Sequence, residues 1–473
     1  MSGNSHSAHP RLKLSRVPAH ACFFIWINDE AAQLEYGLTA PVPGIRMTFR
    51  FVHAADLHLD SPLRSLALRD PALADLIGNA TRRAFIAVVR LCIDEQVDAL
   101  LLAGDLYDGE QTSMKTARFL ADQIHQLHQA GIQVFIIRGN HDALSKITKE
   151  LTFPDSVTLF GGRAATVAIE RGRGALPITI HGISFSNPHA PESLLAKFRP
   201  PVEGAVNIGL LHTSLGGSAG HDPYAPCDVA DLHRMGFRYW ALGHVHGRAV
   251  LQGQATIVMP GIPQGRDIGE AGAKSVTLVT VGDDGSITTE ERHSSVAQFE
   301  RVTVDLAGVQ DWRDLPAALG TALAQARDAV VSEHLVARLR LTGTTPLAWR
   351  LRRDMDLLRT EAQRQAEAIG KTWIDKIEVE CQPEQATPGS SGLAVADPLE
   401  ELRRLMYEAA GNDAYRAEIN AIAEELRGQL PQECRSIMGT DAQAFAALLD
   451  TAALDGIDEV LARLKSAPAA GVG

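Results

Sequence analysis

The feature that most constrains the fold of this chain is a set of five polar motifs, each placed directly after a short apolar run. The first motif closes FVHAADLHLD, which begins at Phe51, and contains Asp56 and His58. The other four occur in LLLAGDLYDG, FIIRGNHDA, IGLLHTS and WALGHVHG, and they contain Asp105, Asn140, His141, Asp142, His212, His244 and His246. Because sites in α/β sheets form where the carboxyl ends of buried strands and their loops converge, the motifs predict one common site.

The residue types in these motifs are metal ligands. The pairs Asp56/His58 and His244/His246 are each spaced i, i+2, and in extended backbone such side chains point the same way, so each pair can share one ion. Mixed nitrogen and oxygen donors without thiolate favour Mn²⁺, Fe or Zn²⁺ over Ca²⁺ or Mg²⁺. The donors are too many for one ion and suit two ions bridged by a carboxylate: Asp56, His58, Asp105, Asn140, His212, His244 and His246. Two such ions, about 3.5–4 Å apart, clamp a phosphoryl group and activate water.

The order of the apolar patterns predicts an α/β fold. A strand over 49–53, a helix over 80–95, the run DALLLAG, a helix over 112–130 and the run IQVFIIRG alternate along the chain. From residue 157 to 293 strands dominate. We therefore expect a two-sheet β-sandwich flanked by helices.

A chain of 473 residues is expected to form two or three domains. Residues 1–46 show no sustained period, which favours a disordered or mis-called N-terminal extension, with a genuine N-terminal arm as the alternative. Residues 47–296 form the predicted sandwich domain. A small α+β capping module over 297–383 follows, including one helix over 346–369. A Pro/Gly/Ser-rich linker over 384–396 then leads to an acidic helical tail over 397–466.

Charge and composition narrow the class of protein. The five cysteines form no CxxC pair and no 18-residue apolar window occurs, which predicts a cytoplasmic protein that does not span a membrane. The net charge is −12, and the segment from Ser391 onward holds 14 acidic against 7 basic residues. A nucleic-acid binder usually shows a basic face. If DNA is the substrate, local patches, metal ions or a partner must supply the attraction.

In this order, D-x-H, GD, GNHD, H and GHxH resemble the motifs of the calcineurin-like metallophosphoesterases, over residues 49 to about 293. The resemblance implies a metallophosphoesterase fold and two bound divalent ions, Mn²⁺ first among them. It assigns one ion to Asp56, His58, Asp105 and His246, and the other to Asp105, Asn140, His212 and His244. It also implies that His141 acts on the leaving oxygen as a general acid or hydrogen-bond donor, with Asp142 orienting it.

Three further features resemble the DNA-repair exonuclease branch of this superfamily, the SbcD/YhaO-like proteins: the opening HAADLHLDSP, the stretch HTSLGGSAGHDPYAPC and the position of the capping module. They imply a 3′→5′ exonuclease, with endonuclease activity left open, that partners an SMC-like coiled-coil ATPase. The acidic tail is then either a docking element or a segment that folds back on its own core. One departure is Asp108, where this branch commonly has a catalytic histidine; His221 is the candidate substitute or a plain surface residue.

Two other functions fit the same motifs. One is a phosphodiesterase or phosphatase acting on nucleotides or phosphoproteins. The predicted capping module disfavours this alternative. The other is a regulatory or scaffold subunit of an ATPase complex, which the intact ligand set disfavours. A homodimer is left open.

Overall fold

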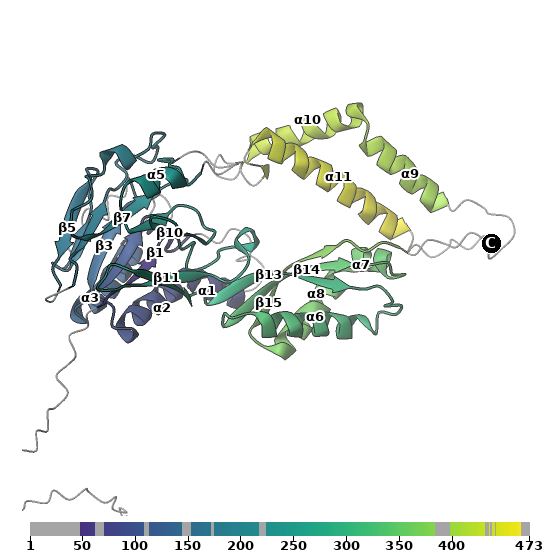
Figure 1. Cartoon of the computed structure of the whole chain (residues 1–473). Coiled ribbons are helices and arrows are strands. Elements are labelled where there is room, and N and C mark those ends of the chain that lie inside the picture. The colour runs from purple at the N-terminus through teal and green to yellow at the C-terminus, as the bar shows by residue number, and fades with distance from the viewer. Residues whose placement is uncertain are drawn as a thin grey trace, which may run out of the picture. The chain divides into compact units, whose positions relative to one another are not determined.

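A computed structural model describes residues 48–61, 71–107, 113–143, 153–171, 175–216, 224–383, 398–430, 435, 438–439 and 441–464 (Figure 1). Three sheets organise these residues, two of six strands and one of three. The expected N-terminal extension over 1–46, the linker over 384–396, Asp108 and His221 lie outside the described residues.

The first six-stranded sheet has the order β12-β11-β1-β2-β3-β4. Its parallel part consists of β1 (Phe49–Ala54), β2 (Ala99–Ala103), β3 (Gln133–Ile137) and β4 (Val157–Leu159). The strands β11 (Ser275–Val281) and β12 (Ile287–His293) extend it in antiparallel pairing. Helices α1 (Pro71–Gly78), α2 (Ala80–Asp94) and α3 (Met114–Gln129) lie between its strands in the chain.

The second six-stranded sheet has the order β5-β6-β7-β8-β10-β9. Its parallel centre consists of β6 (Ile178–Gly182), β7 (Val206–His212), β8 (Tyr239–Gly243) and β10 (Thr256–Met259). The edge strands β5 (Ala165–Ile169) and β9 (Ala249–Leu251) pair antiparallel. Short helices η1 (Leu195–Lys197), α5 (Val229–Arg234) and η2 (Ile268–Glu270) lie in the connections.

The two sheets pack face to face, which confirms the predicted sandwich. Side chains alternate along each strand, so one set from each sheet fills the space between them. The interior set includes Phe51, Leu101, Phe135, Ile180, Leu210 and Tyr239. The opposite face of the first sheet packs on α2 and α3, whose apolar residues recur at three- and four-residue spacing, as with Phe85 and Val88. The outer face of the second sheet, with Leu211 and Trp240, packs on Leu232 of α5. Both six-stranded sheets are therefore buried on two faces, as the continuous apolar runs predict.

The third sheet consists of β13 (Ala297–Asp305), β14 (His334–Thr342) and β15 (Thr372–Val379), all parallel. With α6 (Leu315–Ala329), α7 (Ala348–Arg353) and α8 (Met355–Ile369) it forms the expected strand-helix-strand-helix-strand order. The prediction of a single helix over 346–369 is wrong, because the structure has two helices there, α7 and α8. The chain leaves helical geometry at Asp354, with φ −100° and ψ 41°, and the Asp354 carboxylate is paired with Arg350 and Arg353. Aspartate is a poor helix former, which favours a break at this position.

The tail is helical as predicted, with α9 (Pro398–Ala410), α10 (Asp413–Gln429) and α11 (Ala442–Leu464). Ile457 and Leu461 of α11 pack with Leu402 and Met406 of α9 on one side and with Trp349 of α7 on the other. The tail therefore folds back, in part, on the three-stranded module. Within the part of the chain that the structure describes, no helix is long and apolar enough to cross a membrane.

Candidate metal centre

The five predicted motifs meet at one edge of the sandwich. Each begins at the carboxyl end of a strand: β1, β2 and β3 in the first sheet, β7 and β8 in the second. Neighbouring parallel strands end at the same edge of a sheet, and the two sheets face each other. The candidate residues at this edge are Asp56, His58, Asp105, Asn140, His141, Asp142, His212, His244 and His246.

One group of donors consists of Asp56, His58 and His246, whose ligand atoms lie within 4.8 Å of one another. The Nε2 atoms of His58 and His246 are 3.1 Å apart. Asp56 and His58 are buried, whereas the side chain of His246 is 30% exposed. This group joins the first sheet to the loop after β8.

A second group consists of Asp105, His212 and His244, again with ligand atoms within 4.8 Å of one another. His244 and His246 thus lie in different groups, so the sharing of one ion expected from their i, i+2 spacing is wrong, because the backbone at His244 is not extended. The Nε2 atom of His212 lies 3.3 Å from Oδ2 of Asp105 and 3.1 Å from Oδ1 of Asn140. A third combination of the same size joins Asp105 to His58 and to His141. Asp105 therefore has donors of both groups as neighbours, the position that a bridging carboxylate needs.

Backbone strain is concentrated at these ligands. Asp56, His58, Asp105 and His244 have φ values of 53°, 41°, 52° and 102°. Left-handed backbone at a residue other than glycine costs of order 1–3 kcal/mol and persists where surrounding contacts enforce it. The amide of Asp56 donates to the carbonyl of Gly104 at 3.0 Å, and the amide of His244 donates to both Asp56 carboxylate oxygens at 3.0 Å. These bonds hold the strained segments so that their side chains converge.

Glycines give the donors the space they occupy. A Cβ atom on Gly139 would collide with the Asp105 carboxylate and lie 2.7 Å from Nε2 of His212. A Cβ atom on Gly104 would lie 2.5 Å from Nδ1 of the same His212 ring. Gly104 also has φ 94°, a conformation that favours glycine. The glycines before the motifs therefore make room for ligand side chains.

Hydrogen bonds orient two of the imidazoles. Nδ1 of His212 lies 2.9 Å from the carbonyl oxygen of Ala103, and Nδ1 of His246 lies 2.8 Å from Oε1 of Glu270. A proton on each Nδ1 leaves the Nε2 lone pair directed at the other donors. Glu270 is not among the residues that the motifs predict. Its only signal in the sequence is the polar run PQGRDIGE between two strands.

Burial and close pairing shift the protonation of the cluster. Burial lowers the pKa of His58 to about 3 and, against attraction from His212, raises the pKa of Asp56 to about 6. Burial would also raise the pKa of Asp105, but the imidazoles of His212 and His58 hold that pKa well below its usual range. The same pairing with Asp105 raises the pKa of His212 although burial opposes it. Nearby positive charge thus stabilises the buried carboxylates of this site, and a divalent cation would supply such charge.

Asp142 ties two of the motif loops together. Its carboxylate accepts the amides of Leu106 at 2.9 Å and Tyr107 at 3.0 Å, which belong to the loop after β2. Burial, with added repulsion from Asp105, raises the pKa of Asp142 to about 7. Its neighbour His141 is half-buried, donates its backbone amide to Oδ1 of Asp105 at 3.0 Å, and packs edge-on against the His58 ring.

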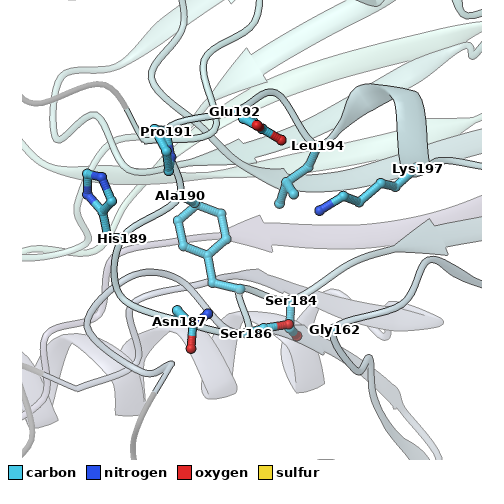
Figure 2. Close-up of a pocket in the computed structure, with 11 residues that line it drawn as sticks. Gly162, Ser184, Ser186, Asn187, His189, Ala190, Pro191, Glu192, Leu194 and Lys197 are labelled. Atoms are coloured by element: carbon cyan, nitrogen blue, oxygen red, sulfur yellow. The ribbon is translucent and has the colours of Figure 1, made fainter.

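A pocket of about 190 Å³ lies beside His212 of the second donor group, separated from it by the Phe185 side chain. Phe185 lines this pocket and also packs edge-on against the His212 ring, with the two ring centroids 5.6 Å apart. The Lys197 side chain points into the pocket beside Leu194, with Glu192, His189 and Asn187 on other parts of its wall (Figure 2). The pocket therefore lies one side chain away from the predicted donors.

The His/Asp clusters fit a two-metal site, and the similarity to known proteins agrees. Residues 49–248 match the calcineurin-like phosphoesterase family. The metallophosphoesterase YhaO of Bacillus subtilis (strain 168) is 31% identical over 398 residues, which cover 82% of this chain and 96% of that protein. The chain belongs to the calcineurin-like metallophosphoesterases. Its similarity to YhaO extends beyond the metal centre, because residues 299–382 match the middle domain of YhaO.

Two other relatives are similar over about half of the chain. The DNA double-strand break repair protein Mre11 of Sulfurisphaera tokodaii is 28% identical over 220 residues, which cover 43% of this chain and 50% of that protein. The SbcD component of the nuclease SbcCD of Bacillus subtilis is 23% identical over 280 residues, which cover 51% of this chain and 68% of that protein. The chain is thus a metallophosphoesterase related to nucleases.

Proposed function

We propose that this chain is a metal-dependent phosphodiesterase that cleaves DNA, acting as the 3′→5′ exonuclease component of a repair complex. The observation that carries the proposal is the convergence of two donor groups around Asp105. The relatedness to a double-strand break repair protein and to a nuclease component supports DNA as the substrate. The match of residues 299–382 to the YhaO middle domain supports a capping domain beside the centre, which a small-molecule phosphatase does not require.

The proposed ligands fall into two sets that share Asp105. One set is Asp56, His58, Asp105 and His246, and the other is Asp105, Asn140, His212 and His244. We propose Mn²⁺ for both positions, with Fe and Zn²⁺ as alternatives that the donor types also suit. When bound, two divalent ions polarise a phosphodiester and supply an activated water for in-line attack.

The remaining residues act on the substrate or on these ligands. The half-buried ring of His141 packs against the His58 ring, and its backbone amide donates to the Asp105 carboxylate. There it donates a proton or a hydrogen bond to the leaving 3′ oxygen. Asp142 orients His141 through the backbone, because its carboxylate holds the loop after β3 to the amides of Leu106 and Tyr107.

The domain limits proposed from the sequence follow the same division: 47–296 for hydrolysis, 297–383 for the cap, 384–396 for the linker and 397–466 for the tail. We propose that the tail docks an SMC-like coiled-coil ATPase. Ile422 and Leu426 on α10 are 61% and 53% exposed, whereas α11 packs partly on α7 and α9 packs on α11. An exposed apolar stripe on a helix suits the groove or seam of a helical partner. With a net charge of −12, such a partner would also supply much of the affinity for DNA.

Hydrolysis of end-labelled DNA tests the proposal. Double- and single-stranded substrates labelled at the 5′ or the 3′ end are incubated with the full chain and Mn²⁺, beside bis-p-nitrophenyl phosphate as a generic diester. A 3′→5′ exonuclease releases the 3′ label first and shortens the 5′-labelled strand progressively. Cleavage of the generic diester with intact DNA would instead favour a phosphodiesterase or phosphatase acting on nucleotides or phosphoproteins.

Asp105→Ala removes the proposed bridge and is expected to abolish both Mn²⁺ binding and hydrolysis. Asp122→Ala is the matched control, since it removes an exposed carboxylate on α3. Hydrolysis that survives Asp105→Ala at the wild-type rate would rule out the two-metal mechanism. Bound Mn²⁺ without turnover in the wild type would favour a regulatory or scaffold role.

A further inference from the structure

We propose that Glu270, held in place by Arg266, positions His246 for metal binding. The inference rests on the proposed role of His246 as a ligand, and it assigns a function to a segment that none of the five motifs includes. Glu270 is a positioning residue here, because it acts through the imidazole and not on the substrate.

The ring of His246 depends on a neighbouring side chain to fix its orientation, whereas the buried ring of His212 does not. We call that support the brace on His246. The His212 ring is fully buried and bonds to the Ala103 carbonyl inside the sandwich. The His246 side chain is 30% exposed and follows the end of β8, so the sandwich interior does not enclose it. Its Nδ1 lies 2.8 Å from Oε1 of Glu270, and Nδ1–H donating to that carboxylate directs Nε2 toward His58. A carboxylate in this position fixes the tautomer and strengthens the ring as a ligand.

The Glu270 carboxylate is itself fixed by Arg266. The Arg266 backbone amide donates to Oε2 at 2.8 Å, and Nη2 of its guanidinium donates to Oε1 at 2.7 Å. Nε of the same guanidinium lies 3.2 Å from both carboxylate oxygens. These charge-assisted bonds occupy the oxygens of a largely buried acid, whose side chain is 13% exposed. Glu270 is therefore held against His246 and kept from swinging into the centre as a further ligand.

The segment that carries the pair is anchored outside the metal centre. Ile268 of η2 packs with Leu73 of α1 and with Phe299 and Val336 of the three-stranded sheet. The Gln264 side chain accepts the amide of Val296 at 2.8 Å and donates to the Ala297 carbonyl at 2.7 Å, where β13 begins. The brace on His246 is thus built from a connection that also holds the first strand of the YhaO-like middle domain.

Titration of the metal-free full chain with Mn²⁺ by calorimetry tests the inference. We expect two sites in the wild type, and in Glu270→Gln one dissociation constant raised about 10–100-fold with the other nearly unchanged. Glu95→Gln is the matched control. Glu95 is also paired with two arginines, Arg50 and Arg292, but it lies near the opposite end of β1 from the motif, and its loss should leave both constants unchanged.

Two further measurements separate positioning from general stability. At saturating Mn²⁺, Glu270→Gln should lower kcat for the generic diester while KM stays within about twofold, because the substrate does not touch Glu270. The electron paramagnetic resonance spectrum of the Mn²⁺ pair should change in Glu270→Gln and not in Glu95→Gln. Arg266→Gln keeps the Glu270 carboxylate but removes the guanidinium that holds it. This variant should therefore weaken Mn²⁺ binding at the same site by a smaller factor.

The outcomes are distinguishable. Wild-type Mn²⁺ constants in Glu270→Gln would overturn the inference and leave the proposed function standing. A wild-type chain that binds none of Mn²⁺, Fe²⁺ and Zn²⁺ would overturn both. Circular dichroism checks that each variant folds. If Glu270→Gln does not fold, Arg266→Gln decides, since unchanged Mn²⁺ constants in that variant would refute the brace.

Discussion

His53 and His212 are both fully buried, yet their neighbours give them opposite chemistry. His53 lies in the sandwich between the Tyr239 hydroxyl and the Leu242 carbonyl, each 3.0 Å away, and burial lowers its pKa to about 3. His212 faces Asp105 at 3.3 Å, and that carboxylate raises its pKa. The Asp105 carboxylate therefore accounts for the opposite pKa shifts of these two buried imidazoles.

The neutral state of His53 should appear in the dependence of stability on pH. The unfolded chain protonates this imidazole below about pH 6.5, whereas the folded chain does so only near pH 3. Stability that is present above pH 6.5 is therefore lost toward pH 3, by about 1.4 kcal/mol per pH unit for one group. The free energy of unfolding is measured with urea at pH 7, 6 and 5 in the presence of a chelator that removes bound metal. It should decline less steeply with falling pH in His53→Gln than in the wild type. Parallel declines in the two proteins would contradict this account.

His141→Ala separates catalysis from metal binding. The proposed role as a proton or hydrogen-bond donor predicts that turnover falls about 10²–10⁴-fold while two Mn²⁺ ions remain bound. Turnover of the generic diester and metal content by mass spectrometry are measured on the same preparations. The ring of His141 lies in one donor combination with His58 and Asp105, so a parallel loss of metal would mean that His141 is itself a ligand.

At the scale of the elements, the strand ends are packed more tightly than the sequence pattern indicates. The loops after β2 and β3 meet across Gly104, Gly139 and the Asp142 carboxylate. The Asp105 carboxylate, from the loop after β2, occupies the space that a Cβ on Gly139 of the loop after β3 would need. The two loops are therefore packed as one unit. A change in either loop should therefore be felt at the metal centre.

Gly139→Ala tests this packing. The new Cβ would collide with the Asp105 carboxylate, and we expect a loss of about 1–3 kcal/mol in the free energy of unfolding together with weakened Mn²⁺ binding. Gly78→Ala is the control, since a Cβ there meets nothing within 4 Å. Chemical denaturation and Mn²⁺ calorimetry on both variants give the comparison. Wild-type Mn²⁺ affinity in Gly139→Ala would show that the loops tolerate the side chain.

At the scale of the whole molecule, metal binding and folding should be linked. The donors come from strands between β1 and β8, far apart in sequence, so the unfolded chain cannot present them together. Mn²⁺ at about 100 times its dissociation constant should then stabilise the fold by about 2.7 kcal/mol per site. Thermal unfolding with Mn²⁺ and with a chelator measures this, and Asp105→Ala should remove the difference. Equal melting temperatures in the wild type would exclude the linkage.

Much of the architecture could be predicted because its signals are local. The run LLLA before Asp105 and the spacing of Phe85 and Val88 identify a buried strand and an amphipathic helix without knowledge of their partners. The helix break at Asp354 could not be read in the same way, because a single aspartate disfavours a helix only weakly and does not by itself end one. The packing of the tail on Trp349 depends on contacts between distant segments, which a local pattern does not contain.

The sequence by itself determined which side chains are available as donors and that each follows a buried strand, since residue type and apolar periodicity are properties of short segments. Only the tertiary structure decided which donors share a group, because that follows from how the two sheets face each other. It also decided that Glu270 braces His246, since that contact joins residues 24 apart through a connection with no recognisable motif. Local sequence patterns thus set which donor side chains end the strands, and long-range packing sets which of them lie together.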